Sequence, residues 1–147
     1  MSKPIHILNG PNLNLLGTRE PEVYGSMSLA DIEQACTVHA RDLGFSIVFR
    51  QSNHEGELID WLHDANVNAS AVVFNPGAYT HTSVALHDAV RAIEPPVIEV
   101  HLSQTAAREA FRHHSYIASA ARGSITGLGL NSYLLGITAA AGCLETQ

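Results

Sequence analysis

Five short apolar runs rich in β-forming residues alternate with segments of helical period, and this alternation constrains the fold more than any other feature. The runs are 5–8, 45–49, 71–74, 97–100 and a weaker 124–126. Strands that alternate with helices predict a parallel sheet with right-handed crossovers, covered on both faces. For 147 residues, taken as one domain over 1–147, the expected fold is α/β: a flavodoxin-like three-layer sandwich with strand order 2-1-3-4-5.

The segments between these runs predict five helices. The first has its apolar residues on one face and a cap at Ser28 and Asp31, and the second follows an apparent capping box at Ser52 and Glu55. The positions that indicate the helices are, in order, Leu29, Ile32, Cys36 and Leu43; Leu58, Ile59 and Leu62; Val84, His87 and Val90; the segment 106–113; and Tyr133, Leu134, Ile137 and Ala141.

Composition excludes several classes of function. The net charge of −6 argues against non-specific binding to nucleic acid or to anionic membranes. The longest mostly apolar stretch, 134–144, is too short to span a bilayer. Cys36 and Cys143 are expected to be free thiols in a reducing, cytoplasmic environment. The nine histidines include no pair spaced i, i+4, so no metal site is expected.

Polar residues follow three of the predicted strands, at the carboxyl ends where sheets of this kind bind their ligands. They are Asn9 and Asn12 after the first run, Asn75 and His81 after the third, and Glu99 and His101 at the end of the fourth. Glu99 and His101 are two residues apart and therefore face the same side of a strand. A carboxylate beside an imidazole supports general acid or base chemistry. Amides and hydroxyls at this density suit a neutral polyol better than a phosphate.

Each of these residues also has an ordinary structural interpretation. Asn9 and Asn75 precede Gly or Pro and are typical turn residues. His101 alone could be a buried core histidine, and His81 alone a loop residue. Two further pairs also have an ordinary interpretation as solvated surface residues. Arg19 and Tyr24 belong to a long connection, and the length of this connection predicts a lid near 17–27. Arg108 and Arg112 are spaced i, i+4, as on a solvated helix face.

Five motifs, in order along nearly the whole chain, resemble those of the type II 3-dehydroquinate dehydratases. They are LNGPNLNLLG at 8–17 with Arg19-Glu20-Pro21 and Tyr24-Gly25, QSNHEG at 51–56, NPGAYTHTS at 75–83, EVHLS at 99–103 and FRHHS at 111–115. One departure is Gln104, which stands where the family commonly has Asn.

The resemblance implies a flavodoxin-like fold and a reaction without metal or other cofactor. The substrate would be 3-dehydroquinate, converted to 3-dehydroshikimate by anti elimination of water through an enolate, in the shikimate pathway of aromatic amino acid biosynthesis. It also implies a cytoplasmic homododecamer built from four trimers. No partner beyond the substrate and other copies of the chain is implied, neither nucleic acid nor membrane.

By the same resemblance, Tyr24 acts as the base in its ionised form, and Arg19 and Arg108 favour that form. His101 is the acid that protonates the departing hydroxyl, and Glu99 orients it. Further residues would hold a water at the enolate oxygen (Asn12), bind the substrate (Asn75, His81, Leu102, Ser103 and Arg112) or reach the site of a neighbouring subunit (Asp88).

Three alternatives remain open at this point. An FMN-binding module would want a Ser/Thr-rich phosphate loop after the first strand, where Pro11 and Leu13 stand. A receiver domain would want acidic residues at the ends of the first and third strands. The same dehydration through a lysine Schiff base would need a lysine near the site, but the one lysine, Lys3, precedes the first strand.

Overall fold

The computed structural model describes residues 2–18, 22 and 26–145, and its strands form one parallel sheet of order β2-β1-β3-β4-β5. The strands are β1 (Ile5–Asn9), β2 (Ile47–Gln51), β3 (Ala71–Asn75), β4 (Val97–His101) and β5 (Gly123–Thr126). This confirms the α/β class and the flavodoxin-like strand order. β1 lies between β2 and β3, with Asn9 level with Asn75, so the loops after β1 and β3 leave the sheet side by side.

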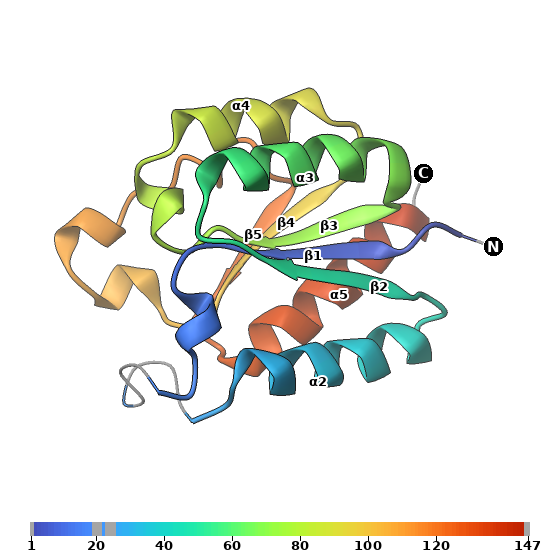
Figure 1. Ribbon diagram of the computed structural model, residues 1–147, viewed down its shortest axis with the longest axis horizontal. Helices are drawn as coiled ribbons and strands as arrows, with labels where there is room; N and C mark the ends of the chain where they lie inside the picture. The colour runs from blue at the N-terminus through green and yellow to red at the C-terminus, as the bar shows by residue number, and fades with distance from the viewer. Residues whose placement is uncertain (1, 19–21, 23–25, 146–147) are drawn as a thin grey trace.

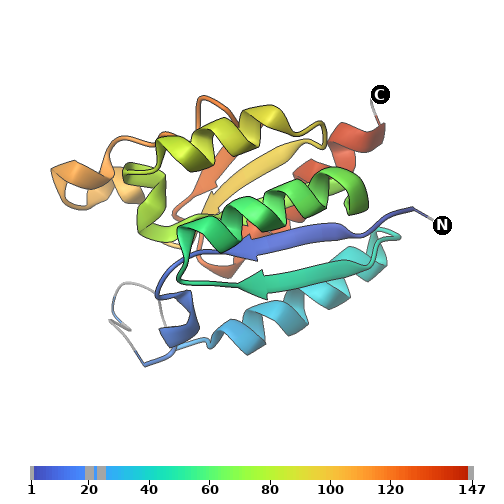
Figure 2. The same ribbon diagram turned by 45° about the horizontal axis from the view of Figure 1, so that its top comes forward.

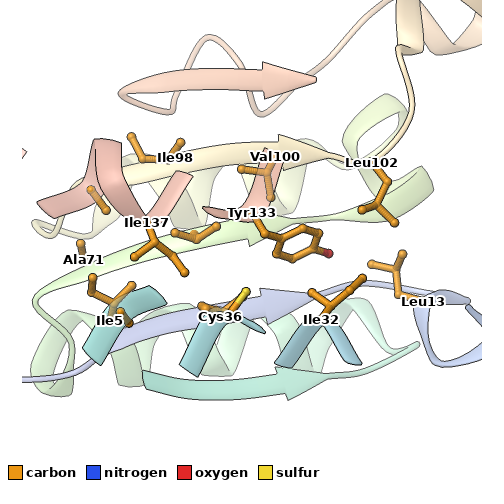
Figure 3. Close-up of a cluster of buried hydrophobic side chains, with 14 of the residues drawn as sticks. Ile5, Leu13, Ile32, Cys36, Ala71, Ile98, Val100, Leu102, Tyr133 and Ile137 are labelled. Carbon is orange, nitrogen blue, oxygen red and sulfur yellow. The ribbon is translucent and has the colours of Figure 1, made fainter. Parts of the chain in front are cut away.

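Helices cover both faces of the sheet (Figure 1). On one face lie α3 (Glu55–Asn68) and α4 (Val84–Ala92), and on the other lie α2 (Leu29–Asp42) and α5 (Leu130–Glu145). Successive side chains of a strand point to opposite faces, so each β1 residue serves one of two cores. Ile5 and Ile7 pack with α2 and α5, while Leu8 packs with α3 and α4. Figure 3 shows the first of these cores, with Tyr133 of α5 among its members.

α2 begins and ends as its sequence dictates. Ser28 Oγ accepts from the Asp31 amide at 3.1 Å and the Asp31 carboxylate accepts from the Ser28 amide at 3.0 Å, which confirms the predicted cap. At the other end, the Gly44 amide donates to Arg41 and the Phe45 amide to Ala40. Gly44 takes φ +89°, as this helix ending requires. Phe45 thus belongs to the end of the helix, and β2 starts two residues later than predicted.

The capping box predicted for α3 is wrong. His54 is the N-cap residue and makes no side-chain cap, and Ser52 Oγ instead accepts from the His54 amide at 3.0 Å. The Ser52 hydroxyl therefore closes a local turn before the helix.

The helix predicted over 106–113 is also wrong. Two single 3₁₀ turns stand there, η3 (Thr105–Ala107) and η4 (Ala110–Arg112), separated by an extended Arg108 at φ −103° and ψ −163°. The Arg108 carbonyl accepts from His113 Nε2 at 2.9 Å. A side chain, and not a helical backbone amide, therefore provides the hydrogen bond to this carbonyl oxygen.

The short turns gather at the carboxyl edge of the sheet, the edge where the parallel strands end. η1 (Leu13–Leu15) follows β1, η2 (Gly77–His81) follows β3, and η3 and η4 follow β4; both ribbon views place them on this side (Figures 1 and 2). The loops after β1 and β3 touch, because a Cβ at Gly10 would lie 2.2 Å from the Pro76 carbonyl oxygen. None of the helices within the described residues has the length and apolarity needed to cross a bilayer.

Candidate active site

A pocket of about 200 Å³ opens beyond the carboxyl ends of β1, β3 and β4, where ligands bind in sheets of this kind. Its lining comes from three segments that are distant in sequence. The lining residues are Pro11, Asn12, Leu13, Asn75, Gly77, Ala78, His81, His101, Leu102, Ser103, Thr105, Arg108 and Arg112. Eight of the residues predicted for the site are among them, namely Asn12, Asn75, His81, His101, Leu102, Ser103, Arg108 and Arg112.

β4 supplies a carboxylate and an imidazole that contact each other. Glu99 and His101 project to the same side of the strand, and His101 Nε2 lies 2.7 Å from Glu99 Oε2. Both are buried, with 1% and 7% of their surfaces exposed. An ionised carboxylate only accepts hydrogen bonds, so Nε2 carries a proton and Nδ1 is the nitrogen left for other chemistry. The predicted pairing is confirmed in its geometry.

The Glu99 carboxylate is surrounded by hydroxyl groups as well. Thr80 Oγ1 and Ser115 Oγ donate to Oε2 at 2.5 and 2.9 Å, and Ser124 Oγ donates to Oε1 at 3.0 Å. Burial alone raises the pKa of Glu99. The hydrogen bond and charge of His101, with the hydroxyls of Thr80 and Ser115, outweigh burial and lower that pKa to about 2. Glu99 is therefore an anion at any physiological pH.

His81 enters the pocket from η2. Its Nδ1 lies 2.8 Å from the His114 carbonyl oxygen, which can only accept, so Nδ1 is protonated. Burial lowers the pKa of His81, and the charges of His101 and Arg112 lower it further. In this neutral ring, Nε2 has a free lone pair that can accept a hydrogen bond from a ligand hydroxyl.

Asn75 is held by a buried amide–phenol network at the ends of β1 and β3. Its Nδ2 donates to the Tyr133 hydroxyl at 2.9 Å, and that hydroxyl donates to Asn9 Oδ1 at 2.7 Å. Asn75 Oδ1 accepts from the Gly77 amide at 3.1 Å. These contacts define which end of the Asn75 amide is nitrogen, and they leave its second N–H as a donor. Asn75 is thus both the turn residue and the pocket residue that the sequence suggested.

Two guanidinium groups reach the pocket from the segment after β4. Arg108 donates to Ser103 Oγ at 3.4 Å, and Arg112 Nε lies 3.1 Å from the carboxylate of the exposed Glu109. The i, i+4 spacing suggests that the two arginines share a helix face. The described residues form no α-helix there, so a different feature brings them together. The break at Arg108 between the two 3₁₀ turns allows both side chains to line the same cavity.

Asn12 has a left-handed backbone, with φ 68° and ψ −5°, and no other described residue except glycine has a positive φ. Asn tolerates this conformation better than most residues. The Asn12 amide donates to Asn53 Oδ1 at 3.0 Å, which ties the loop after β1 to the loop after β2. Non-glycine residues in this conformation cluster at functional sites.

Four predicted residues are not among the lining, and one of them is Glu99, the buried partner of His101. Asp88 lies exposed on α4 and is not part of the lining. Arg19 and Tyr24 lie outside the described residues. Within the described ranges, no group of three or more His, Cys, Asp or Glu side chains could hold a metal ion. Lys3 stands just before β1, at the opposite edge of the sheet, and its Nζ donates to the Val67 carbonyl oxygen.

Sequence reasoning missed four residues that shape the site: Thr80, Ser115, Ser124 and Tyr133. Thr80 and Ser115 stood inside quoted motifs without a role, and Tyr133 was placed only as an apolar helix position. Strand pairing is the signal that could have found Ser124, because β5 is in register with β4 and places Ser124 opposite Glu99.

A parallel α/β sheet that presents a carboxylate-bound imidazole, amides and two guanidiniums in one pocket defines an enzyme for acid–base chemistry on a small anionic, hydroxylated ligand. Comparison with known proteins identifies which enzyme class this is. The family model described as dehydroquinase class II matches residues 3–141, and the chain belongs to that family, whose members are hydro-lyases.

Individual relatives agree with this assignment. The 3-dehydroquinate dehydratase of Maricaulis maris is 87% identical over 140 residues, covering 95% of this chain and 96% of the relative. That of Rhizobium etli is 60% identical over 139 residues, covering 95% and 96%. The crystal structure of type II dehydroquinase from Propionibacterium acnes superposes with a TM-score of 0.92 at 42% identity, covering 97% of this chain and 98% of the other.

Proposed function

We propose that the pocket at the carboxyl edge removes water from 3-dehydroquinate through an enolate, giving 3-dehydroshikimate, with His101 as the general acid. The 3-dehydroquinate dehydratase activity, a step of the shikimate pathway, follows from the family and from the relatives above. The observation that carries the assignment of roles is the 2.7 Å contact between His101 Nε2 and the ionised Glu99, inside a pocket that also holds two arginines.

The acid step follows from this contact. Because Nε2–H donates to Glu99, the proton for the departing hydroxyl comes from Nδ1 of a doubly protonated ring. The Glu99 anion stabilises that imidazolium. Transfer of the Nδ1 proton to the hydroxyl releases water and leaves a neutral imidazole, whose Nε2–H still faces Glu99.

The base in this proposal is Tyr24, acting as tyrosinate, with Arg19 and Arg108 as the cations that favour its ionised form. A phenol has a reference pKa of about 10. Lowering that value towards neutrality requires roughly 3–4 kcal/mol of preferential interaction with the anion, which two guanidiniums in a closed site can supply. The lid near 17–27 would bring Arg19 and Tyr24 over the pocket and exclude water.

The remaining lining residues would bind the substrate. Arg112 suits the carboxylate, because a guanidinium forms two parallel hydrogen bonds with one. His81 Nε2 and the free N–H of Asn75 suit hydroxyl groups, and the backbone at Leu102 and Ser103 closes the site. Asn12 would hold a water against the developing enolate oxygen.

We further propose a cytoplasmic homododecamer of four trimers. Asp88, exposed on α4 and away from its own pocket, would then reach the pocket of a neighbouring subunit. In this proposal residues 1–147 form a single domain with a lid-like loop near 17–27.

The test is to incubate the protein with 3-dehydroquinate and follow the conjugated enone product in the ultraviolet, together with exchange of the substrate's α-proton in deuterated water. Tyr24→Phe should abolish both exchange and elimination. His101→Ala should block elimination while exchange continues. His63→Ala, an exposed histidine of α3, is the matched control and should keep wild-type rates. Normal elimination by His101→Ala would refute the assignment of the acid.

A further inference from the structure

The Glu99 carboxylate accepts four hydrogen bonds, although the proposed chemistry uses only the one from His101. Oε2 accepts from His101, Thr80 and Ser115, and Oε1 accepts from Ser124. The three additional donors come from three elements: Thr80 from η2, Ser115 from the segment after η4, and Ser124 from β5. Three separate parts of the chain therefore converge on one buried anion.

The surrounding contacts determine the direction of the Ser115 hydroxyl. Ser115 Oγ accepts from the backbone amides of Ile117 at 3.1 Å and Ala118 at 3.0 Å. With both lone pairs used, its proton has to point towards an acceptor, and Glu99 Oε2 lies 2.9 Å away. Thr80 Oγ1 lies 3.0 Å from Ser115 Oγ because both hydroxyls donate to that same oxygen.

We propose that Thr80, Ser115 and Ser124 are positioning residues for catalysis, which hold Glu99 as an acceptor-only anion and so keep the Nε2 proton on His101. A protonated Glu99 would be a weaker acceptor for the three hydroxyls than the anion is. Transfer of the His101 Nε2 proton to Glu99 is therefore opposed, and the ring keeps Nε2–H while Nδ1 serves the substrate. This inference rests on the proposed role of His101 as the acid.

The hydroxyls also share the negative charge that would otherwise act on His101 alone. A Glu99 with fewer donors attracts the imidazolium more strongly, so the ring releases its Nδ1 proton less readily. A general acid works only when protonated, so the basic limb of the pH–rate profile reports on it. The charged and titratable groups facing the pair from the other elements are His81, Arg108, Arg112, His113 and His114.

The experiment measures kcat and KM against pH for Thr80→Val and Ser124→Ala. Valine has nearly the shape of threonine without its hydroxyl, and Thr80 is fully buried. We expect kcat to fall about tenfold in Thr80→Val and about threefold in the more exposed Ser124→Ala, with KM within about twofold of wild type. In both variants the basic limb should move to higher pH. Glu99→Gln, which removes the anion, should move the limb to lower pH.

Two controls separate this role from a structural one. Thr80→Ser keeps the hydroxyl and should restore most of the rate. Ser119→Ala alters an exposed serine outside the network and should match wild type. A lower melting temperature with an unshifted pH profile in Thr80→Val and Ser124→Ala would overturn the proposal.

The design also distinguishes failure of this inference from failure of the proposed function. If His101→Ala is inactive while Ser124→Ala has a wild-type profile, only the positioning role is refuted. If His101→Ala keeps near-normal turnover, the acid assignment itself falls. Ser124 lies on the edge strand β5, so Ser124→Ala decides the question even if Thr80→Val does not fold.

Discussion

The phenol of Tyr133 joins two buried amides, and removing it should measure what that network contributes. Tyr133, Asn9 and Asn75 are 0%, 0% and 3% exposed. Tyr133→Phe leaves the Asn9 oxygen without its donor and one Asn75 N–H without its acceptor, in a place where water does not replace either. Each unpaired buried group costs about 1–3 kcal/mol. Because two groups are left unpaired, we expect Tyr133→Phe to lower the free energy of unfolding by about 2–6 kcal/mol.

Thermal unfolding followed by near-ultraviolet circular dichroism, at fixed protein concentration, measures this loss. For a chain of this size, each kcal/mol corresponds to about 2–4 °C, so the melting temperature should fall by about 4–24 °C. The matched control is Tyr79→Phe, which removes a hydroxyl that donates at 2.7 Å to the Asn53 carbonyl in an exposed position. Water can replace that contact, and the loss should stay below about 1 kcal/mol. Equal melting temperatures for the two variants would refute the argument. KM should also rise in Tyr133→Phe, because Asn75 loses one of the contacts that orient it.

Four other outcomes are expected. The pKa of Glu99 is lowered from 4.5 to about 2. The ionised carboxylate therefore stabilises the fold fully above pH 4.5, and this contribution, on the order of 3 kcal/mol, is lost as the pH falls through about 2. In Glu99→Gln, the free energy of unfolding should depend less on pH between these two values. Borohydride added with substrate should leave activity intact, because Lys3 is far from the pocket; covalent labelling by substrate carbon would contradict this. Gly10→Ala should lower the melting temperature markedly, since its Cβ would meet the Pro76 carbonyl at 2.2 Å. Asp88→Ala should reduce the assembled mass, the activity or both, measured by light scattering beside an assay; a variant unchanged in both would mark Asp88 as an ordinary surface acid.

The layers of the fold could be predicted from sequence because each strand and most helices have a local pattern of apolar residues. The errors lie where structure depends on contacts that are distant or made by side chains. The helix expected over 106–113 fails because the Arg108 carbonyl pairs with His113 and the Tyr116 amide pairs with the Thr80 carbonyl across the molecule. Periodicity does not contain that information.

The contacts of the site also divide into those that local sequence predicts and those that depend on distant parts of the chain. Glu99 and His101 are two apart on one strand, so their proximity follows from the pleat alone. The approach of Ser124 to Glu99 depends instead on the register between β4 and β5, which the residues of either strand do not encode separately. Tyr133 meets Asn9 across 124 positions of sequence, which only the packed α5 can bring about.

The pocket is supported in two different ways, and this difference bears on which ligands it can tolerate. The imidazole side rests on β4, paired on both edges and buried, so its atoms have little freedom to move. The guanidinium side rests on two single turns that lack the hydrogen-bond ladder of a longer helix. With the substrate carboxylate on Arg112, as proposed above, inhibitors should be able to vary widely in that acidic group. Changes of even an ångström next to His101 should be penalised, so selectivity among ring analogues should be strictest at the departing hydroxyl.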